Sequence, residues 1–102
     1  MTYTVGTEKF NTKAHLTQRC IDIRNKYQPL KDATVSDSGE DDFLRALLRL
    51  HQDAADKIGQ GIDHFEVRRN EPWGTYGFWA IRIDGTEDDF SYPHIIGGLS
   101  PD

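Results

Sequence analysis

The sequence predicts an α+β domain: an antiparallel sheet of three to four strands, covered on one face by two main helices plus a short third helix. Apolar residues recur at helical spacing in two segments of the first half of the chain. In the second half, two segments alternate with the period of a strand and are followed by the turn pair Asp84-Gly85. With 102 residues and no segment typical of a domain boundary, we expect a single domain over residues 1–102.

Charge limits the kinds of partner that the chain can have. The formal net charge is −5, from 12 Lys and Arg against 17 Asp and Glu. The acidic excess lies in the second half of the chain. A general DNA or RNA binder needs clustered basic side chains to release counterions, so any basic surface here must be local.

Cysteine usage and hydropathy indicate the compartment. Cys20 is the only cysteine, so no internal disulfide can form, which is typical of a reducing cytoplasm. The first residues lack the features of a signal peptide. No run approaches the roughly 18 apolar residues of a membrane helix. We therefore expect a cytoplasmic protein without a membrane partner.

Residues 3–10 alternate weakly and predict a short edge strand, after which Asn11 or Thr12 can cap a helix. This helix is predicted over residues 13–27 by one apolar stripe, formed by Leu16, Cys20, Ile23 and Tyr27. Its polar face is either simply solvated or contacts phosphate, and consists of His15, Arg19, Asp22 and Lys26.

Pro29 is expected to end this helix, and residues 28–39 predict a polar loop. A capping-box-like start at Ser38 then begins a second helix, with acidic residues in its first turn. Its apolar arc comprises Phe43, Leu44, Leu47, Leu48, Leu50 and His51. On the opposite side, Arg45 and Arg49 are expected in solvent.

His51 is interpreted as a partly buried imidazole at a helix end, where it bonds backbone carbonyls or the next turn. A metal role would need partners, and the other histidines show no ligand spacing to His51 or to each other. Cys20 has no partner cysteine. We therefore expect no metal site and no cofactor.

A short third helix is expected over Ala54–Ile58, capped by Asp53 and with Ala55 and Ile58 facing inward. The chain must then stop a helix and enter a strand, so we expect positive φ at Gly59 or Gly61. These glycines superficially suggest an anion loop. Such a loop precedes a helix, however, whereas these glycines follow one, so phosphate binding here is disfavoured.

The hairpin follows, with strands predicted over residues 62–69 and 78–83 and a long turn over 71–77. A two-residue turn at Asp84-Gly85 would pair Trp79 with Phe90. This register assigns Phe65, Val67, Trp79, Ile81, Ile83, Phe90 and Tyr92 to the core face. The other face then carries His64, Glu66, Arg68, Phe78, Ala80, Arg82, Glu87, Asp89 and Ser91. In the tail, Ile95 or Ile96 can join the core, and the last residues should fray.

Any binding function is predicted on the uncovered sheet face, at His64, Arg68, Phe78 and Arg82. An aromatic ring among cations is a common way to hold single-stranded RNA, because a base stacks while Arg contacts phosphate. The alternative is structural, since Glu66, Glu87 and Asp89 share the face. In that case Arg82 would only form a cross-strand pair.

Catalysis is not expected. Asp88 and Asp89 are adjacent on a strand, so their carboxylates would point to opposite faces instead of sharing a cleft. Ser91 has no histidine placed by the sequence to activate it. We therefore expect that the chain is not an enzyme.

Four segments in order resemble the DCL (Defective Chloroplasts and Leaves) domain family, a domain of unknown function named for a plant protein. They are Phe10-Asn-Thr-Lys-Ala14, Asp42-Phe-Leu-Arg-Ala-Leu-Leu-Arg-Leu-His51, Ala55-Asp-Lys-Ile-Gly-Gln-Gly-Ile62 and Asp84-Gly-Thr-Glu-Asp-Asp-Phe-Ser-Tyr92. The resemblance implies a small α+β domain without known enzymatic activity. Plant members are linked to processing of chloroplast ribosomal RNA, and a similar domain ends the largest subunit of a plant-specific RNA polymerase.

The leading hypothesis is a non-catalytic accessory domain that acts near nucleic acid, in RNA binding or ribosomal RNA processing, with RNA or a ribonucleoprotein as partner. The alternative is a protein–protein interaction module whose partner supplies the chemistry. A monomer is favoured. The salt dependence of binding separates the two hypotheses, since phosphate contacts give a steep slope.

Overall fold

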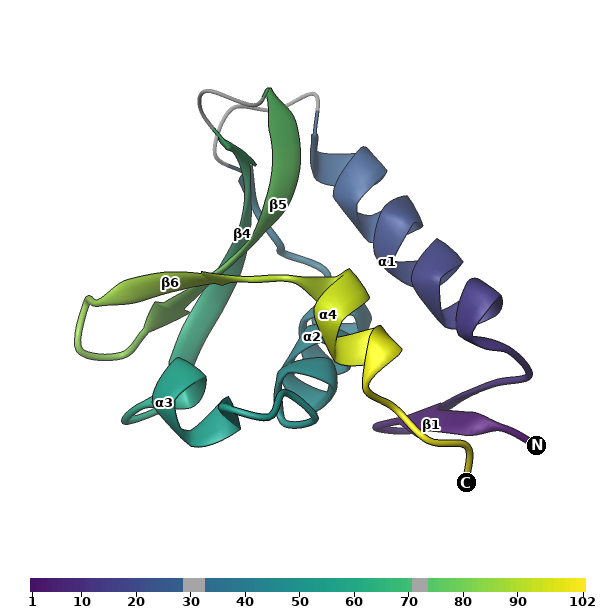
Figure 1. Cartoon of the computed structure of the whole chain (residues 1–102). Helices are drawn as coiled ribbons and strands as arrows, with labels where there is room; N and C mark the ends of the chain where they lie inside the picture. Colours follow the sequence, from purple (N-terminus) through teal and green to yellow (C-terminus); the bar gives the residue numbers. More distant parts are fainter. Residues whose placement is uncertain (29–32, 71–73) are drawn as a thin grey trace.

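The predicted α+β architecture is confirmed by the computed structural model, which describes residues 1–28, 33–70 and 74–102 (Figure 1). An antiparallel four-stranded sheet has the order β3-β4-β5-β6, and β1 and β2 form a separate two-stranded sheet. The elements are β1 (Tyr3–Val5), β2 (Glu8–Phe10), α1 (Lys13–Tyr27), β3 (Ala33–Thr34), α2 (Ser38–Leu48), α3 (Ala54–Ile58), β4 (Ile62–Asn70), β5 (Thr75–Arg82), β6 (Glu87–Phe90) and α4 (Tyr92–Gly97).

The N-terminal residues form a hairpin of their own and not an edge strand of the main sheet. Strands β1 and β2 pair with each other, and Gly6 turns the chain with φ 63°. A side chain at Gly6 would place its Cβ 3.1 Å from Ala46 Cβ, so the turn lies directly on α2. Val5 is buried there and joins the main hydrophobic core.

Helix α1 matches its predicted bounds. The Thr12 hydroxyl caps it by accepting a hydrogen bond from the His15 N–H at 3.1 Å. All four residues of the predicted apolar stripe are buried. Cys20 is fully buried, and burial raises the pKa of its thiol to about 12. The predicted helix stop at Pro29 lies outside the described residues.

Helix α2 begins as predicted at Ser38, but its cap is Asp37, whose carboxylate accepts the Glu40 N–H at 2.9 Å. The apolar arc is confirmed over Phe43, Leu44, Leu47 and Leu48, which are all buried. Leu50 is 42% exposed, because the helix ends at Leu48 and the arc ends with it. The loop predicted before α2 also contains the short strand β3, which pairs with β4.

The corner after α2 confirms the glycine prediction and part of the packing prediction. Gly59 has φ 57° and Gly61 has φ 131°, so positive φ is confirmed at both positions. Helix α3 lies at the lower end of the sheet (Figure 1), where Ile58 is partly buried against the core as predicted, whereas Ala55 is exposed. His51 is half-buried as predicted, and its Nδ1 accepts the Asp53 N–H at 2.9 Å, which is the predicted bond to the next turn. Asp53 itself makes no side-chain cap.

The β5–β6 connection is a three-residue loop, and the predicted two-residue turn was wrong. The Arg82 N–H donates to the Thr86 carbonyl at 2.8 Å, and Gly85 takes the left-handed position with φ 86°. The register therefore moves by one residue, so that Phe78 faces Phe90 and Trp79 faces Asp89. A shift of one residue exchanges the two faces of a strand.

This shift reverses the predicted faces of β5. Phe78 and Ala80 are buried beside Phe65, Val67 and Phe90, while Trp79 and Ile81 lie on the opposite face. Ile83, predicted in the core, is 60% exposed in the loop. The faces of β4 and β6 match the prediction. Strand β5 begins at Thr75, earlier than predicted, and residues 71–73 of the predicted turn lie outside the described residues.

The tail forms helix α4, a helix that the sequence analysis does not predict. Ser91 caps it by accepting the His94 N–H, and Pro93 occupies its first turn. Ile95 and Ile96 are both buried, as predicted. The last residue is bonded and not frayed, because the Asp102 N–H donates to the Thr2 carbonyl at 2.7 Å. Within the described ranges, the helices are all too short or too polar to cross a membrane.

Candidate functional site

Helices cover only one face of the four-stranded sheet. Helices α1, α2 and α4 all lie on the same side of β4 and β5 (Figure 1). We call the opposite side the open face, which consists of His64, Glu66 and Arg68 from β4, Trp79 and Ile81 from β5, and Glu87 and Asp89 from β6. This face is where the sequence predicted a binding function.

Only two of the four predicted site residues reach the open face, namely His64 and Arg68. Phe78 is fully buried, because the register shift turns it toward the helices. The side chain of Arg82 follows the same face and is only 13% exposed. Its guanidinium donates to the carbonyls of Lys57 at 2.9 Å and Asp56 at 3.2 Å, so Arg82 caps the C-terminal end of α3.

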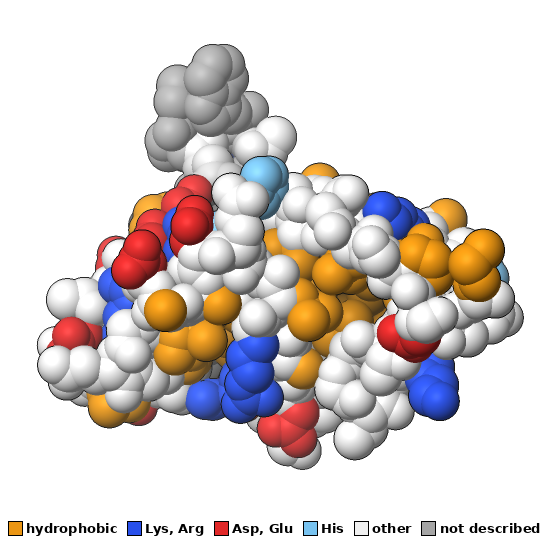
Figure 2. Space-filling model, turned by 60° about the horizontal axis from the view of Figure 1, so that its bottom comes forward, with side chains coloured by type: hydrophobic (Ala, Val, Ile, Leu, Met, Phe, Trp, Pro, Cys, Tyr) orange, Lys and Arg blue, Asp and Glu red, His pale blue; other side chains and the backbone are white. Residues whose placement is uncertain are grey.

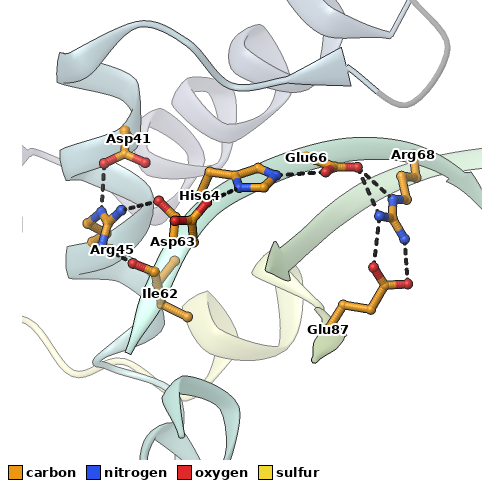
Figure 3. Close-up of polar contacts among 8 residues, drawn as sticks. All are labelled: Asp41, Arg45, Ile62, Asp63, His64, Glu66, Arg68 and Glu87. Carbon is orange, nitrogen blue, oxygen red and sulfur yellow. Dashed lines mark hydrogen bonds and ion pairs between the residues drawn. The ribbon is translucent and has the colours of Figure 1, made fainter. Parts of the chain in front are cut away.

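Four charged residues of the open face, together with Asp63 beside it, form one continuous chain of contacts (Figure 3). His64 lies between two carboxylates, with Nδ1 2.6 Å from Asp63 and Nε2 2.7 Å from Glu66. Glu66 also accepts from Arg68 Nε at 2.9 Å. The two terminal nitrogens of Arg68 then donate to Glu87 at 2.8 and 2.9 Å. We call these five side chains the Asp63–Glu87 network.

Electrostatics favour the charged forms of His64, Glu66 and Glu87 in this network. Partial burial lowers the pKa of His64, but hydrogen bonds to Asp63 and Glu66 outweigh it, so the pKa is raised overall. Burial would raise the pKa of Glu66, yet its bonds to His64 and Arg68 hold that pKa below its usual value. The hydrogen bonds from Arg68 lower the pKa of Glu87 as well. The network therefore carries three negative charges against at most two positive ones.

Trp79 supplies the aromatic ring that the sequence had assigned to Phe78. The guanidinium carbon of Arg68 lies 5.1 Å from the Trp79 ring centroid, a cation–π arrangement. The indole Nε1 is buried, and within the described part of the chain it has no hydrogen-bond partner. The open face thus has the predicted pairing of an aromatic ring with a cation, but two carboxylates neutralise that cation.

Beside this face, two cationic side chains donate hydrogen bonds to main-chain carbonyls of β4 and β6. Arg45, expected in solvent, pairs with Asp41 at 2.6 Å and donates to the carbonyls of Ile62 at 2.8 Å and Asp63 at 2.9 Å (Figure 3). Lys57 donates to the Asp89 carbonyl at 2.9 Å on the β6 side. Charged side chains at strand edges hinder pairing with another strand. At these points a partner must contact side chains and not extend the sheet.

The structure also bears on two other kinds of site that the sequence raised, a phosphate-contacting face on α1 and a metal site. On the polar face of α1, Arg19 pairs with Glu8 and Lys26 pairs with Glu40, each at 3.2 Å. Both cations are thus held by acids of the same chain instead of being free for phosphate. Over residues 1–28, 33–70 and 74–102, no three His, Cys, Asp or Glu side chains meet in a way that could hold a metal ion.

The surface of the domain also has hollows away from the open face. Figure 2 shows the lower side of the molecule, where hydrophobic side chains gather near the middle with charged side chains around them. On the helix-covered side, a hollow of about 400 Å³ lies between α4 and the loop after α2. It is lined by Leu50, Gln52, Pro93, His94, Ile95, Gly97 and Gly98, so it offers little charge for binding a polar ligand.

Fold and surface together define a small α+β domain with an open, acidic sheet face. The profile of the family described as "Protein of unknown function (DUF3223)" matches residues 22–96, and the chain belongs to this family. The finer resemblance to DCL domains stays a prediction.

Three relatives extend the comparison. The chain is 32% identical over 85 residues to DNA-directed RNA polymerase IV subunit 1 of Arabidopsis thaliana, which covers 83% of this chain and 6% of that protein. It is 37% identical over 59 residues to Protein EMBRYO DEFECTIVE 514 of the same plant, covering 58% and 29% respectively. It thus spans a small part of either relative. A solution NMR structure of an uncharacterized Rhodospirillum rubrum protein has TM-score 0.82 and 35% identity, covering 91% of this chain and 86% of that one.

Proposed function

We propose that this chain is a non-catalytic accessory domain that contacts a protein component of a nucleic-acid-processing assembly through its open face. The observation that carries the proposal is the neutralised arginine of that face. Arg68 donates from Nε to Glu66 and from both terminal nitrogens to Glu87, so two carboxylates already compensate its charge and a phosphate would have to compete with them. Similarity to an RNA polymerase subunit supports the placement near nucleic acid.

Charge argues for a protein partner over direct RNA contact. Four carboxylates, those of Asp63, Glu66, Glu87 and Asp89, lie on or beside the face. Counterion release requires several unpaired cations along a phosphate backbone, whereas His64 and Arg68, the cations that the described residues place on this face, are both paired with carboxylates. Trp and Arg, in contrast, are enriched at the centres of protein interfaces, where they dominate binding energy.

The finer assignment follows from the resemblance to the DCL family. We infer an RNA-processing context, with a ribonucleoprotein as the larger assembly and the cytoplasm as its location. A fully buried, reduced Cys20 is compatible with that compartment. The partner would supply the catalytic groups, since the side chains of the Asp63–Glu87 network are all paired with one another.

A second candidate function is direct stacking of a single-stranded RNA base on Trp79. It is favoured by the arrangement of Arg68 over the indole ring, which resembles how aromatic and cationic side chains hold unpaired bases. For phosphate contact, however, Arg68 would first have to leave Glu87.

The test is a pull-down from native lysate with the wild-type chain, with and without nuclease. Trp79→Ala removes the centre of the open face, and Ile83→Ser serves as the control because it removes an exposed apolar side chain outside that face. We expect a protein that is captured despite nuclease, lost with Trp79→Ala and retained with Ile83→Ser.

A parallel titration with single-stranded RNA at two salt concentrations tests the second candidate. The proposal expects no binding to the isolated domain. Binding with a steep salt slope that Trp79→Ala weakens would instead establish the RNA function. Capture that disappears entirely with nuclease would also contradict the protein-contact proposal.

A further inference from the structure

Arg24 differs from four other half-buried arginines in the kind of partner that its guanidinium has. Arg19, Arg45, Arg68 and Arg82 each form an ion pair with a carboxylate. Arg24 has only neutral partners among the described residues: Nη1 donates to the Tyr92 hydroxyl at 3.0 Å, and Nη2 to the Asn25 side-chain oxygen at 3.4 Å. Its Nε is buried without any partner. A half-buried charge without a counter-charge is costly, so this position favours an external anion.

Arg24 lines a pocket of about 240 Å³ at the end of the sheet, together with Asn70, Tyr76, Asp89, Ser91 and Tyr92. Because β6 ends at Phe90 and the chain turns into α4, β5 continues past β6 with no strand paired to it on this side among the described residues (Figure 1). We call this place the β6 notch. Its size suits one or two residues and is below the roughly 300–1,000 Å³ of drug-sized sites.

The strand register leaves main-chain groups directed into the notch. The Arg82 N–H donates to Thr86, and hydrogen-bonded pairs recur every second residue along an antiparallel ladder. Ala80 with Asp88 and Phe78 with Phe90 follow in that series. The next position on β5 is Tyr76, where β6 has already ended. The Tyr76 amide and carbonyl therefore point away from β4, toward the edge of β5 beyond the end of β6. An extended segment could pair with them there.

We propose that the β6 notch binds the C-terminal end of an extended peptide, with its terminal carboxylate on Arg24 and its last main-chain groups on Tyr76. Addition of a strand to a free sheet edge and capture of a terminal carboxylate are established ways of recognising peptides. Arginine suits the carboxylate because its parallel N–H groups form charge-assisted bonds. The polar groups of Asn70 and Ser91 lie beside the last residue of the peptide.

A nucleic-acid strand fits the notch less well. Among its described lining residues the notch has one cation, Arg24, and one acid, Asp89, and the chain has a net charge of −5. A phosphodiester chain would bring repeated negative charge into this surrounding. The inference rests on the proposed function because both take the partner to be a protein. It adds that this protein presents an extended segment with a free C-terminal carboxylate.

The test uses the full chain, labelled with ¹⁵N, and a panel of acetylated tetrapeptides of sequence AAAX in which X covers all residue types. Each peptide is titrated as the free acid and as the C-terminal amide while the amide signals of Tyr76 and Ser91 are followed. We expect saturable shifts with a subset of the free acids. The amides should bind at least about tenfold more weakly, as for loss of a charge-assisted hydrogen bond.

Arg24→Gln should weaken free-acid binding by a similar factor and remove the difference between acid and amide. Arg24→Lys keeps the charge but loses the parallel N–H groups and should rescue binding only in part. The control is Arg49→Gln, an exposed arginine outside the notch. Preserved signal dispersion in the spectra verifies that each variant is folded.

Equal binding of acids and amides, or no binding by any peptide at millimolar concentration, would overturn the inference. Binding of a 5′-phosphorylated oligouridine that depends on Arg24, without peptide binding, would assign the notch to nucleic acid and also overturn it. These outcomes are separate from the open-face test. A partner that Trp79→Ala loses and Arg24→Gln retains would leave the proposed function standing while the notch inference fails.

Discussion

Replacing Phe78 by Ala should destabilise the protein by about 3–5 kcal/mol, the usual cost of deleting a buried aromatic ring. Phe78 is fully buried, and its ring is stacked on Phe90 with centroids 5.9 Å apart and an 18° angle between planes. It also meets the Tyr92 ring edge-on at 5.9 Å. Each aromatic pair adds about 0.5–1.5 kcal/mol beyond area burial, which favours the upper part of the range.

The neighbouring Trp79→Ala substitution should cost less, about 1–2 kcal/mol, although the ring is larger. Trp79 lies on the open face, is only partly buried, and its main contact is with Arg68. The cost is therefore that of a half-buried side chain and one cation–π pair. The order of the two losses follows directly from the three-residue β5–β6 loop, because the two-residue turn would place Trp79 in the core and Phe78 outside.

Urea unfolding followed by circular dichroism measures both variants on the same scale. Phe78→Leu is the control, since it retains an apolar side chain and should cost appreciably less than Phe78→Ala. Small domains have a total stability of about 5–15 kcal/mol, so Phe78→Ala should remain measurable at low temperature. A loss under about 1 kcal/mol for Phe78→Ala together with a larger loss for Trp79→Ala would refute the register and the faces derived from it.

Three further predictions test separate features. Gly59→Ala should destabilise by about 1 kcal/mol or more, because Gly59 has φ 57° and an added Cβ would lie 3.0 Å from Arg82 Cδ; an unchanged unfolding midpoint would contradict this. Cys20 should react with a thiol reagent only on unfolding, since it is buried and its thiol has a pKa near 12. Rapid labelling without urea would contradict the burial of this thiol. His64→Gln should reduce stability most at low pH. The folded-state pKa of His64 is raised, so its contribution is complete below the unfolded value of about 6.5 and is lost as pH rises through the folded value; equal losses at pH 5 and pH 8.5 would contradict the network.

The helices and the corner could be predicted because each carried several agreeing local signals. Helix α1 had a four-residue stripe and a capping Thr12, and the corner had two glycines at positions that require left-handed backbone. Strand β4 was also clear, since polar and apolar residues alternate along it. This alternation placed His64 and Arg68 correctly on the open face.

Strand β5 carried no such signal. Its residues 78–83 are apolar at every position except Arg82, so either face could be read as the core face. The segment Ile83-Asp84-Gly85 suits a two-residue turn and a three-residue loop equally, and only packing of Phe78 on Phe90 decides between them. Helix α4 did have a local signal, Ser91 followed by a proline in the first turn, which the two later glycines obscured.

The long-range uses of the cations were beyond any local pattern, and they determine what the surface can recognise. Arg82 and Arg45 bind main-chain carbonyls of α3 and β4, and Lys57 binds that of β6, so the fold itself occupies three cations around the sheet. Arg68 is occupied by two carboxylates. In an acidic chain, this leaves recognition to shape and apolar contact at Trp79 and to the one half-buried guanidinium, that of Arg24, that has no carboxylate partner within the described residues. The two surfaces should therefore differ in salt response: contacts on the open face should weaken little with salt, whereas carboxylate binding at Arg24 should weaken measurably.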